Sequence, residues 1–301
     1  MPSGSRERVL VTGTSGLLGR RALNAFQVAG FEVISIDRTA PEDLPSGVVH
    51  HCADLASWEG MDAALRDADV VVHIAALTDV AATSATAMLS GNVALSSRVL
   101  IGAAEAGVAR IVYASSQSAL GFSRAPRPLV PDYVPVDEAH RTYPTESYGV
   151  SKRIGEEICA MIAGSHGIPT VSLRFPVIWA PGMFAGHVAL RMGDPVQAVK
   201  SFWSYVDVRD AAEAVRLAAF VDLPAGHTVL DVSAGWPFCD GDIRDHVAAH
   251  YGAVPGASAL DADSPIYAVD RAAAVLGFRA RYRWWPDRIE DTAAKSASSP
   301  G

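Results

Sequence analysis

The chain has 301 residues, half of which are hydrophobic, and it carries a formal net charge of −8 at pH 7. This length is enough for one large α/β domain, or for two interleaved domains, with a sizeable buried core. The acidic balance and the lack of a basic patch argue against nucleic acid as a partner. We find no N-terminal leader segment and no apolar run of about 18 residues, so we expect a cytoplasmic protein without membrane contact.

The three cysteines predict neither disulfides nor a metal site. Cys52, Cys159 and Cys239 lie far apart in the sequence, and none of them belongs to a CxxC pair. Their odd number and wide spacing are typical of reduced thiols in the cytoplasm, and we expect no bound metal.

The first predicted strand, at residues 8–12, leads into a glycine-rich turn and a helix. The strand (RVLVT) is apolar and β-branched, as buried parallel strands are, and the helical pattern that follows the turn ends at Gly30. Glycines in such a unit permit a tight turn and close approach of a pyrophosphate, and the helix N-terminus offers free N–H groups to the anion. We therefore predict a dinucleotide site that includes Gly13, Ser15, Gly16, Leu17, Leu18 and Gly19.

The next two predicted strands end in residues suited to the adenosine half of a dinucleotide. The second strand ends at Asp37, whose carboxylate would accept hydrogen bonds from ribose hydroxyls and repel a 2′-phosphate, which favours NAD. Arg38 follows, and its guanidinium would suit that phosphate, so NADP remains open. The third strand is expected near residues 48–54, with Asp54 and Leu55 beside the adenine ring.

The fourth and fifth predicted strands place small and polar residues at the same edge of the sheet. Strand 69–74 is followed by Ala75, Ala76 and Leu77, where a dinucleotide could lie across the strand end, and strand 110–114 is followed by Ser115 and Ser116. Between them, a helix at 86–105 carries Asn92. We interpret this amide either as a helix-surface residue or as a group that fixes the loop behind the active site.

A long loop precedes the next helix and strand. Residues 121–144 hold five prolines, which is typical of a lid or binding loop. A helix at 147–164 and a sixth strand at 170–175 complete a repeated alternation of strand and helix, which predicts an α/β fold with a doubly wound parallel (Rossmann) sheet. We predict a dinucleotide-binding domain at 1–175, a smaller, interleaved substrate domain at 176–291 and a disordered tail at 292–301.

The chemistry is expected at the start of helix 147–164. Tyr148 and Lys152 are four residues apart and share one face, and an ammonium beside a phenol favours the phenolate. Tyr148 would exchange a proton with a substrate hydroxyl or carbonyl, while Lys152 would also hold the nicotinamide ribose. Ser116 would orient the substrate oxygen, and the cofactor would carry the hydride. The alternative is an ordinary Tyr–Lys pair on a helix surface.

Together these motifs resemble the extended short-chain dehydrogenase/reductase family, in its NAD-dependent epimerase/dehydratase group. The matching stretches are 12–19 (TGTSGLLG), Asp37, Asp54–Leu55, 72–76 (VHIAA), Asn92–Val93, Ser115–Ser116, 148–152 (YGVSK), Leu173–Arg174, 205–210 (YVDVRD) and 269–278 (VDRAAAVLGF). The resemblance implies bound NAD(P), a Ser116–Tyr148–Lys152 triad, and a homodimer formed through helices 86–105 and 147–164. It adds Asn92, Ser115, Phe175 and Pro176 to the expected cofactor contacts.

Departures from the family pattern narrow the expected reaction. Residues 173–181 read LRFPVIWAP, with Val177 where nucleotide-sugar epimerases of the family carry an Asn. Gln117 and Ser118 follow Ser116, where dehydratases carry an acidic pair. These features favour a dehydrogenase or reductase of a small sugar, sugar acid or related carbonyl compound, similar to the uronate and sugar dehydrogenases. An epimerase and a non-catalytic dinucleotide sensor are the alternatives.

The candidate substrate contacts come from several segments. They are Thr78, Gln117, Ser118, Arg174 and His187. Arg174 would suit a substrate carboxylate, and a structural ion pair is its alternative role. Aromatic candidates for a pocket wall are Trp179, Phe184, Trp203 and Tyr205, for which core packing is the alternative.

Overall fold

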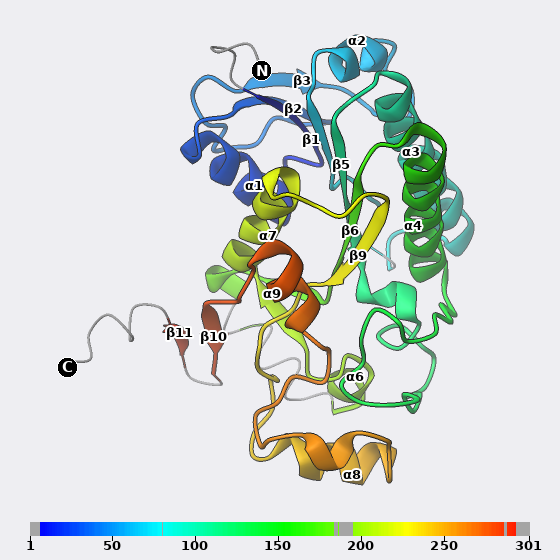
Figure 1. The fold of residues 1–301 in the computed structure, drawn as a ribbon, viewed down its shortest axis with the longest axis vertical. Coiled ribbons are helices and arrows are strands. Elements are labelled where there is room, and N and C mark those ends of the chain that lie inside the picture. The colour runs from blue at the N-terminus through cyan, green and yellow to red at the C-terminus, as the bar shows by residue number, and fades with distance from the viewer. Residues whose placement is uncertain (1–6, 80, 184–185, 187–194, 286–287, 293–301) are drawn as a thin grey trace, which may run out of the picture.

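A computed structural model describes residues 7–79, 81–183, 186, 195–285 and 288–292. The fold is built on a seven-stranded parallel sheet with strand order β3-β2-β1-β4-β5-β6-β9 (Figure 1). The strands are β1 (Arg8–Thr12), β2 (Glu32–Asp37), β3 (Val49–Cys52), β4 (Val70–His73), β5 (Arg110–Ser116), β6 (Thr170–Phe175) and β9 (His227–Asp231). This topology confirms the predicted doubly wound α/β fold.

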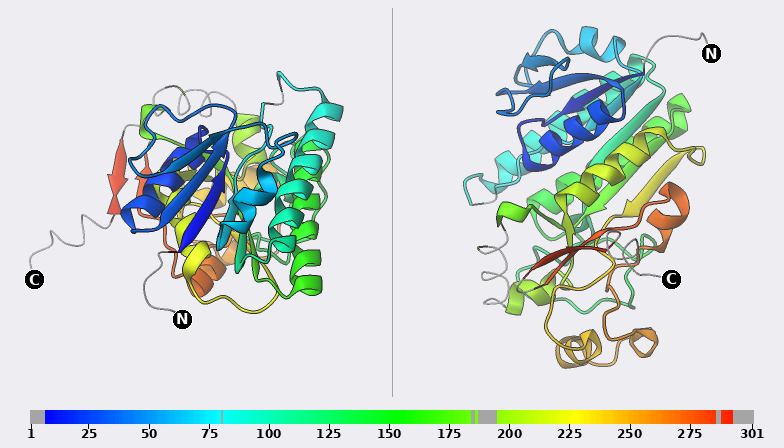
Figure 2. Two further views of the ribbon diagram at one scale, coloured as in Figure 1. Left: turned by 90° about the horizontal axis from the view of Figure 1, so that it is seen from above. Right: turned by 90° about the vertical axis from the view of Figure 1, so that its left-hand side faces the viewer.

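Helices cover both faces of the sheet (Figure 2). In β1, Val9 and Val11 face the layer of α1 (Leu17–Val28), α7 (Val208–Phe220) and α9 (Asp270–Leu276), because successive side chains of a strand alternate between faces. Leu10 faces the opposite layer, formed by α2 (Met61–Arg66), α3 (Ala85–Glu105) and α4 (Ser147–His166). The two apolar layers bury both faces of the sheet, as all-parallel sheets require.

A smaller region lies beyond the edge of the sheet at which β5 and β6 end (Figure 1). Its elements are η1 (Gln117–Leu120), β7 (Val177–Trp179), η2 (Pro181–Met183), α6 (Pro195–Lys200), β8 (Tyr205–Asp207), α8 (Ile243–Tyr251), η3 (Ala257–Ala259), β10 (Tyr282–Trp284) and β11 (Ile289–Asp291). Two separate apolar clusters hold it together, one of which includes residues of the long proline-rich loop. The loop therefore packs into a core that it shares with α6 and α8.

Part of the segment expected in the smaller domain belongs to the sheet itself. Strand β9 pairs in parallel with β6, and α7 packs against α1 on the sheet's face. A seventh strand satisfies the backbone edge that β6 would otherwise expose. The boundary at residue 175 thus does not separate the sheet from the smaller region, because β9 lies after it. A division into two functional domains stays a prediction.

The predicted aromatic wall is packed inside the smaller region. Trp179 and Tyr205 are stacked with ring centroids 5.0 Å apart, and Trp284 packs against them. Trp203 is buried in the neighbouring cluster. Core packing is therefore the correct interpretation for these side chains, and Phe184 lies outside the described residues.

Helix α3 is apolar as well as long. Its mean hydropathy over 18 residues is 1.2, and by length and composition alone it passes for a membrane span. That finding differs from the expectation that no apolar run of this kind exists. In the structure α3 runs beside α4 and contributes Val99, Leu100 and Ala103 to the core, with 39% of the apolar window buried (Figure 1).

Candidate active site

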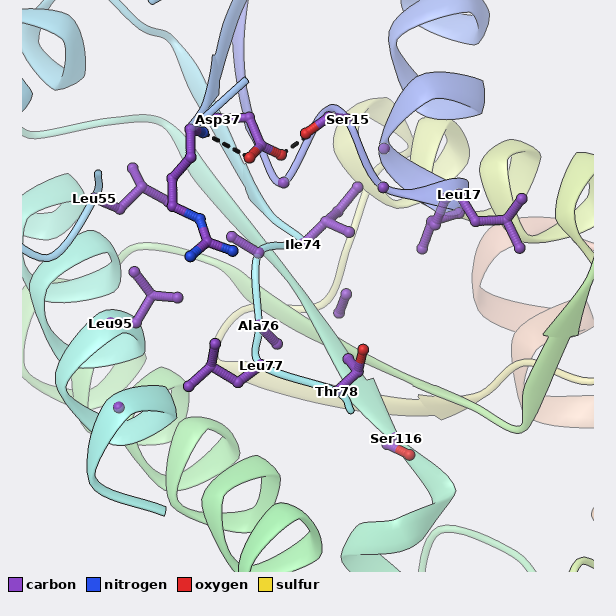
Figure 3. A pocket seen from close by; sticks show the side chains of 18 of the residues that line it. Ser15, Leu17, Asp37, Leu55, Ile74, Ala76, Leu77, Thr78, Leu95 and Ser116 are labelled. Carbon is purple, nitrogen blue, oxygen red and sulfur yellow. Dashed lines mark hydrogen bonds between the residues drawn. The ribbon is translucent and has the colours of Figure 1, made fainter. Parts of the chain in front are cut away.

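A cavity of about 740 Å³ lies at the carboxyl ends of the central strands. Figure 3 shows it between Asp37, which is hydrogen-bonded to Ser15, and Ser116. The predicted cofactor residues that line it are Gly13, Ser15, Gly16, Leu17, Leu18, Gly19, Asp37, Arg38, Asp54, Leu55, Ala75, Ala76, Leu77, Ser115, Tyr148, Lys152, Phe175 and Pro176. The structure thus brings all of them together except Asn92.

The glycine turn leaves room for an anion at the N-terminus of α1. Gly13 has a φ of +77°, and a Cβ at Gly19 would lie 2.0 Å from the carbonyl oxygen of Gly13. Gly16 is the N-cap of α1 and no side chain caps the helix, so its first N–H groups are available to a ligand. A pyrophosphate therefore fits this turn in the way the sequence predicts.

Asp37 is held firmly at the adenosine end of the cavity. One carboxylate oxygen accepts the N–H of Ser15 at 2.9 Å, and the other accepts the N–H of Arg38 at 2.6 Å. Each oxygen retains a free lone pair for a ribose hydroxyl. The Asp37 carboxylate therefore fits the ribose of NAD. Arg38 also lines the cavity and places a positive charge near the same end.

Asn92 does not line the first cavity, but its side chain bonds the backbone of Leu77, which does. Its amide is buried, accepts the N–H of Leu77 at 2.7 Å and donates to the Leu77 carbonyl at 3.0 Å. It also donates to the hydroxyl of Ser151 at 3.2 Å. The side chain therefore ties the loop after β4 to helix α4, and it is not a surface amide.

A second cavity, of about 560 Å³, adjoins the first. It is lined by Ser116, Gln117, Ser118, Ser123, Arg124, Glu146, Tyr148, Phe175, Pro176, Val177, Gln197, Lys200 and Ser201. Four of these residues also line the first cavity: Ser116, Tyr148, Phe175 and Pro176. The serine and the tyrosine of the predicted triad thus stand where the two cavities meet.

The start of α4 positions the tyrosine and the lysine. Glu146 is the N-cap, and its carboxylate accepts the N–H groups of Tyr148 and Gly149 at 2.8 and 2.6 Å. The Nζ of Lys152 donates to the carbonyl of Ala114, in β5, at 2.7 Å. This bond ties the second turn of α4 to strand β5, which ends at Ser116.

Burial sets the protonation behaviour of this pair. The pKa of Lys152 is lowered to about 7, chiefly by burial, and Glu156 opposes the shift. Burial raises the pKa of Tyr148, whereas the guanidinium of Arg124 and the hydroxyl of Ser116 lower it. The Arg124 guanidinium lies 4.5 Å from the centre of the Tyr148 ring, and Lys152 Nζ lies 5.7 Å from it. The cation closest to the phenol ring is therefore Arg124.

Two predicted site residues are engaged elsewhere. Arg174, expected as a substrate contact, is 2% exposed and bonds Glu156 through Nε and Nη2 at 2.8 and 2.9 Å. It lines neither cavity, so the expectation of a substrate contact is wrong and the alternative ion pair holds. Ser115 lines the first cavity, but its hydroxyl donates to Glu156 at 2.7 Å.

The remaining substrate candidates divide between the two cavities. Gln117 and Ser118 line the second cavity, whereas Thr78 lines the first. His187 lies outside the described residues. Sequence reasoning missed Arg124 and Lys200, because neither stands in a motif, although the proline-rich loop that carries Arg124 was singled out as a binding loop.

The chain is similar in sequence and in structure to several known enzymes. The chain is 30% identical over 175 residues to a UDP-glucose 4-epimerase of Azospirillum brasilense (56% of this chain, 48% of that protein) and 29% identical over 171 residues to a uronate dehydrogenase of Pseudomonas putida (56% and 59%). It thus spans about half the length of these relatives. A solved structure of MoeE5 with UDP-glucuronic acid and NAD matches with a TM-score of 0.70 at 26% identity, covering 95% of this chain and 96% of that one.

The family assignment rests on a longer match than either of the two pairwise sequence alignments. The model of the "NAD dependent epimerase/dehydratase family" matches residues 9–229, from the first strand of the sheet to the last. This stretch includes the glycine turn, Ser116, Tyr148 and Lys152. The protein therefore belongs to the NAD-dependent epimerase/dehydratase family.

Proposed function

We propose that this protein is an NAD-dependent dehydrogenase or reductase of a small sugar, sugar acid or related carbonyl compound. The observation that carries the proposal is the position of Ser116 and Tyr148 at the junction of the two cavities. The first cavity has the glycine turn and carboxylate suited to a dinucleotide, and the second has both polar and apolar lining residues and adjoins the same two hydroxyl groups. A substrate in the second cavity would therefore contact the proton-transfer groups beside the cofactor site.

In this proposal each member of the triad has a separate task. When an alcohol is oxidised, the phenolate oxygen of Tyr148 takes the hydroxyl proton, and in the reverse direction the phenol returns that proton to the carbonyl oxygen. Ser116 donates a hydrogen bond to that oxygen, and Lys152, anchored on Ala114, holds positive charge below the phenol. Bound NAD supplies the acceptance or release of a hydride.

The wall of the second cavity supports a small substrate over a nucleotide sugar. Val177 lines this wall and offers no hydrogen bond to a diphosphate. Half of the other lining residues are serines and glutamines, whose hydroxyl and amide groups suit the hydroxyl groups of a polyol. The relatives that act on UDP-sugars would thus differ from this chain in substrate rather than in the handling of the proton.

A spectrophotometric panel tests the proposal. Free sugars, uronates and aldehydes are offered to the purified protein with NAD, NADP and their reduced forms, and absorbance is followed at 340 nm. We expect net NADH formation or consumption with at least one compound, and a higher kcat/KM with NAD than with NADP because of Asp37. Cofactor that stays with the protein, without any net absorbance change, would instead identify an epimerase. NADH binding that alters only the affinity for another protein would identify a sensor.

We also propose a homodimer that forms through α3 and α4. The two helices lie side by side, only part of the apolar surface of α3 is buried within the subunit, and Met161 on α4 is 49% exposed. Pairing with the same surface of a second copy would cover these side chains. Light scattering after size exclusion should give twice the chain mass, and a monomer at micromolar concentration would contradict the proposal.

A further inference from the structure

We propose that the second cavity binds a substrate carboxylate between Arg124 and Lys200; this inference rests on the proposed function and names its substrate class. The two residues come from distant parts of the chain, the proline-rich loop and the end of helix α6. Both line the cavity that contains Ser116 and Tyr148. An acidic substrate held there would have its reacting carbinol next to the phenol.

Lys200 is a largely buried residue for which the described part of the chain provides no counter-ion. It is 9% exposed, and within the described part of the chain no acidic side chain lies within ion-pair distance of it. An ammonium at the wall of a partly enclosed cavity attracts an anionic ligand, because the protein walls focus its field. The cavity that Lys200 faces is the place where such a charge would bind.

Arg124 lies over the Tyr148 ring at the wall of the second cavity. The guanidinium stacks over the Tyr148 ring at 4.5 Å, which is a cation–π arrangement. Within the residues that the structure describes, it forms no ion pair with a carboxylate. A guanidinium presents paired N–H groups that match the two oxygens of a carboxylate. Stacking on the ring would orient this fork before a substrate arrives.

The charge balance of the wall favours a monoanion. Glu146 is the acidic residue of the lining, and its two oxygens already accept the N–H groups of Tyr148 and Gly149. Two cations against one carboxylate leave one positive charge in excess. A carboxylate carries one negative charge, whereas a phosphate monoester carries about two at pH 7. The excess therefore matches a carboxylate better than a phosphate.

Matched substrate pairs test this proposal. Glucuronate and glucose, galacturonate and galactose, and glycerate and glycerol differ in each case by the presence of a carboxylate, and glucose 6-phosphate serves as the phosphate arm. We expect kcat/KM with NAD to be at least about tenfold higher for the better acid than for its neutral partner, since charged hydrogen bonds carry that much selectivity. Preference for the neutral member of every pair would overturn the proposal, and preference for glucose 6-phosphate would replace the carboxylate with a phosphate.

Variants of the two cations test whether they are responsible for the preference for acidic substrates. Lys200→Gln and Arg124→Gln should each lower kcat/KM for the acid by about 10- to 100-fold and shrink the acid-to-neutral ratio. Arg127→Gln, in the same loop but exposed and outside the cavity lining, is the matched control and should leave that ratio unchanged. Ratios that are the same in all three variants and the wild type would overturn the assignment.

A binding measurement separates this inference from the proposed function. Calorimetric titration of NADH-loaded protein with each acid and its neutral partner measures binding to the second cavity without oxidation, because the reduced cofactor cannot accept a hydride. If no compound is turned over, but an acid binds to the wild type and not to Lys200→Gln, the proposed reaction fails while the carboxylate site stands. If neutral sugars are oxidised and no acid binds more tightly than its neutral partner, the reaction stands while the carboxylate site fails.

Discussion

Replacing Arg174 with methionine should destabilise the fold and leave substrate affinity almost unaltered. Arg174 and Glu156 are 2% and 1% exposed, and they share two charge-assisted hydrogen bonds of 2.8 and 2.9 Å. Asp231, also fully buried, lies across the strand pair from Arg174, and the arginine lowers the pKa of its carboxyl, which burial raises. Arg174→Met therefore leaves the Glu156 carboxylate buried without its main counter-ion.

The magnitude follows from the burial of the pair. Removing one partner of a buried ion pair costs about 3–5 kcal/mol of unfolding free energy. At about 2 °C per kcal/mol for a chain of this size, the melting temperature should fall by about 6–10 °C. Arg153 bonds the same carboxylate at 3.2 Å from a partly exposed position, so Arg153→Met should cost only about 0.2–1 kcal/mol.

Urea unfolding and thermal denaturation of both variants are the assays, with the double variant Arg174→Met/Glu156→Met as a third sample. The double variant removes both charges and should recover most of the lost stability, because an apolar pair of similar volume often replaces a buried ion pair at little cost. A single Arg174→Met variant with unchanged stability and a strongly raised KM would refute the structural role and restore this residue as a substrate contact.

Three further predictions concern the cofactor turn and the titrating groups. Gly19→Ala should raise the Kd for NADH at least tenfold in a fluorescence titration, because its Cβ would collide with the backbone of the turn, whereas Gly164→Ala, in open space on α4, should not. Arg124→Gln removes a cation that lowers the pKa of Tyr148, so the pH at which oxidation reaches half its maximal rate should rise; an unchanged profile would contradict this coupling. Burial lowers the pKa of Lys152 to about 7, below its value in the unfolded chain. Below pH 7 the buried lysine is charged, which lowers the free energy of unfolding, and this cost declines as the pH rises from 7 toward 10. The stability advantage of Lys152→Met, measured without cofactor, should therefore shrink over that range, and a constant difference would be evidence against the shift.

Most of the dinucleotide half of the fold could be predicted from local patterns. A buried strand, a glycine turn and an amphipathic helix are each encoded within a few residues, so the phosphate turn is apparent in the sequence. The family match confirms the predicted family and its NAD dependence. The cavity lining follows from the same logic, because the carboxyl ends of parallel strands meet at one edge of the sheet.

The parts that escaped prediction depend on pairings between distant segments. A pattern identifies β9 as a strand, but its partner, β6, precedes it by 57 residues at the Thr170–His227 pair, and no local signal specifies that neighbour. In the sequence Arg174 is a charged residue within an apolar strand. Its partner, Glu156, comes beside it only when α4 packs on the sheet. Arg124 and Lys200 meet at the second cavity because the loop and α6 fold into one cluster, which periodicity cannot show.

Replacement of Tyr148 by phenylalanine tests the central claim most directly, because it removes one oxygen atom from the junction of the two cavities. With the best substrate of the panel, kcat measured by NADH absorbance should fall by about 10²–10⁴-fold. The Kd for NADH, measured in the same preparation, should stay within about threefold of the wild type, since the lost hydroxyl is not part of the phosphate turn or the Asp37 site. Turnover at the wild-type rate would contradict the account.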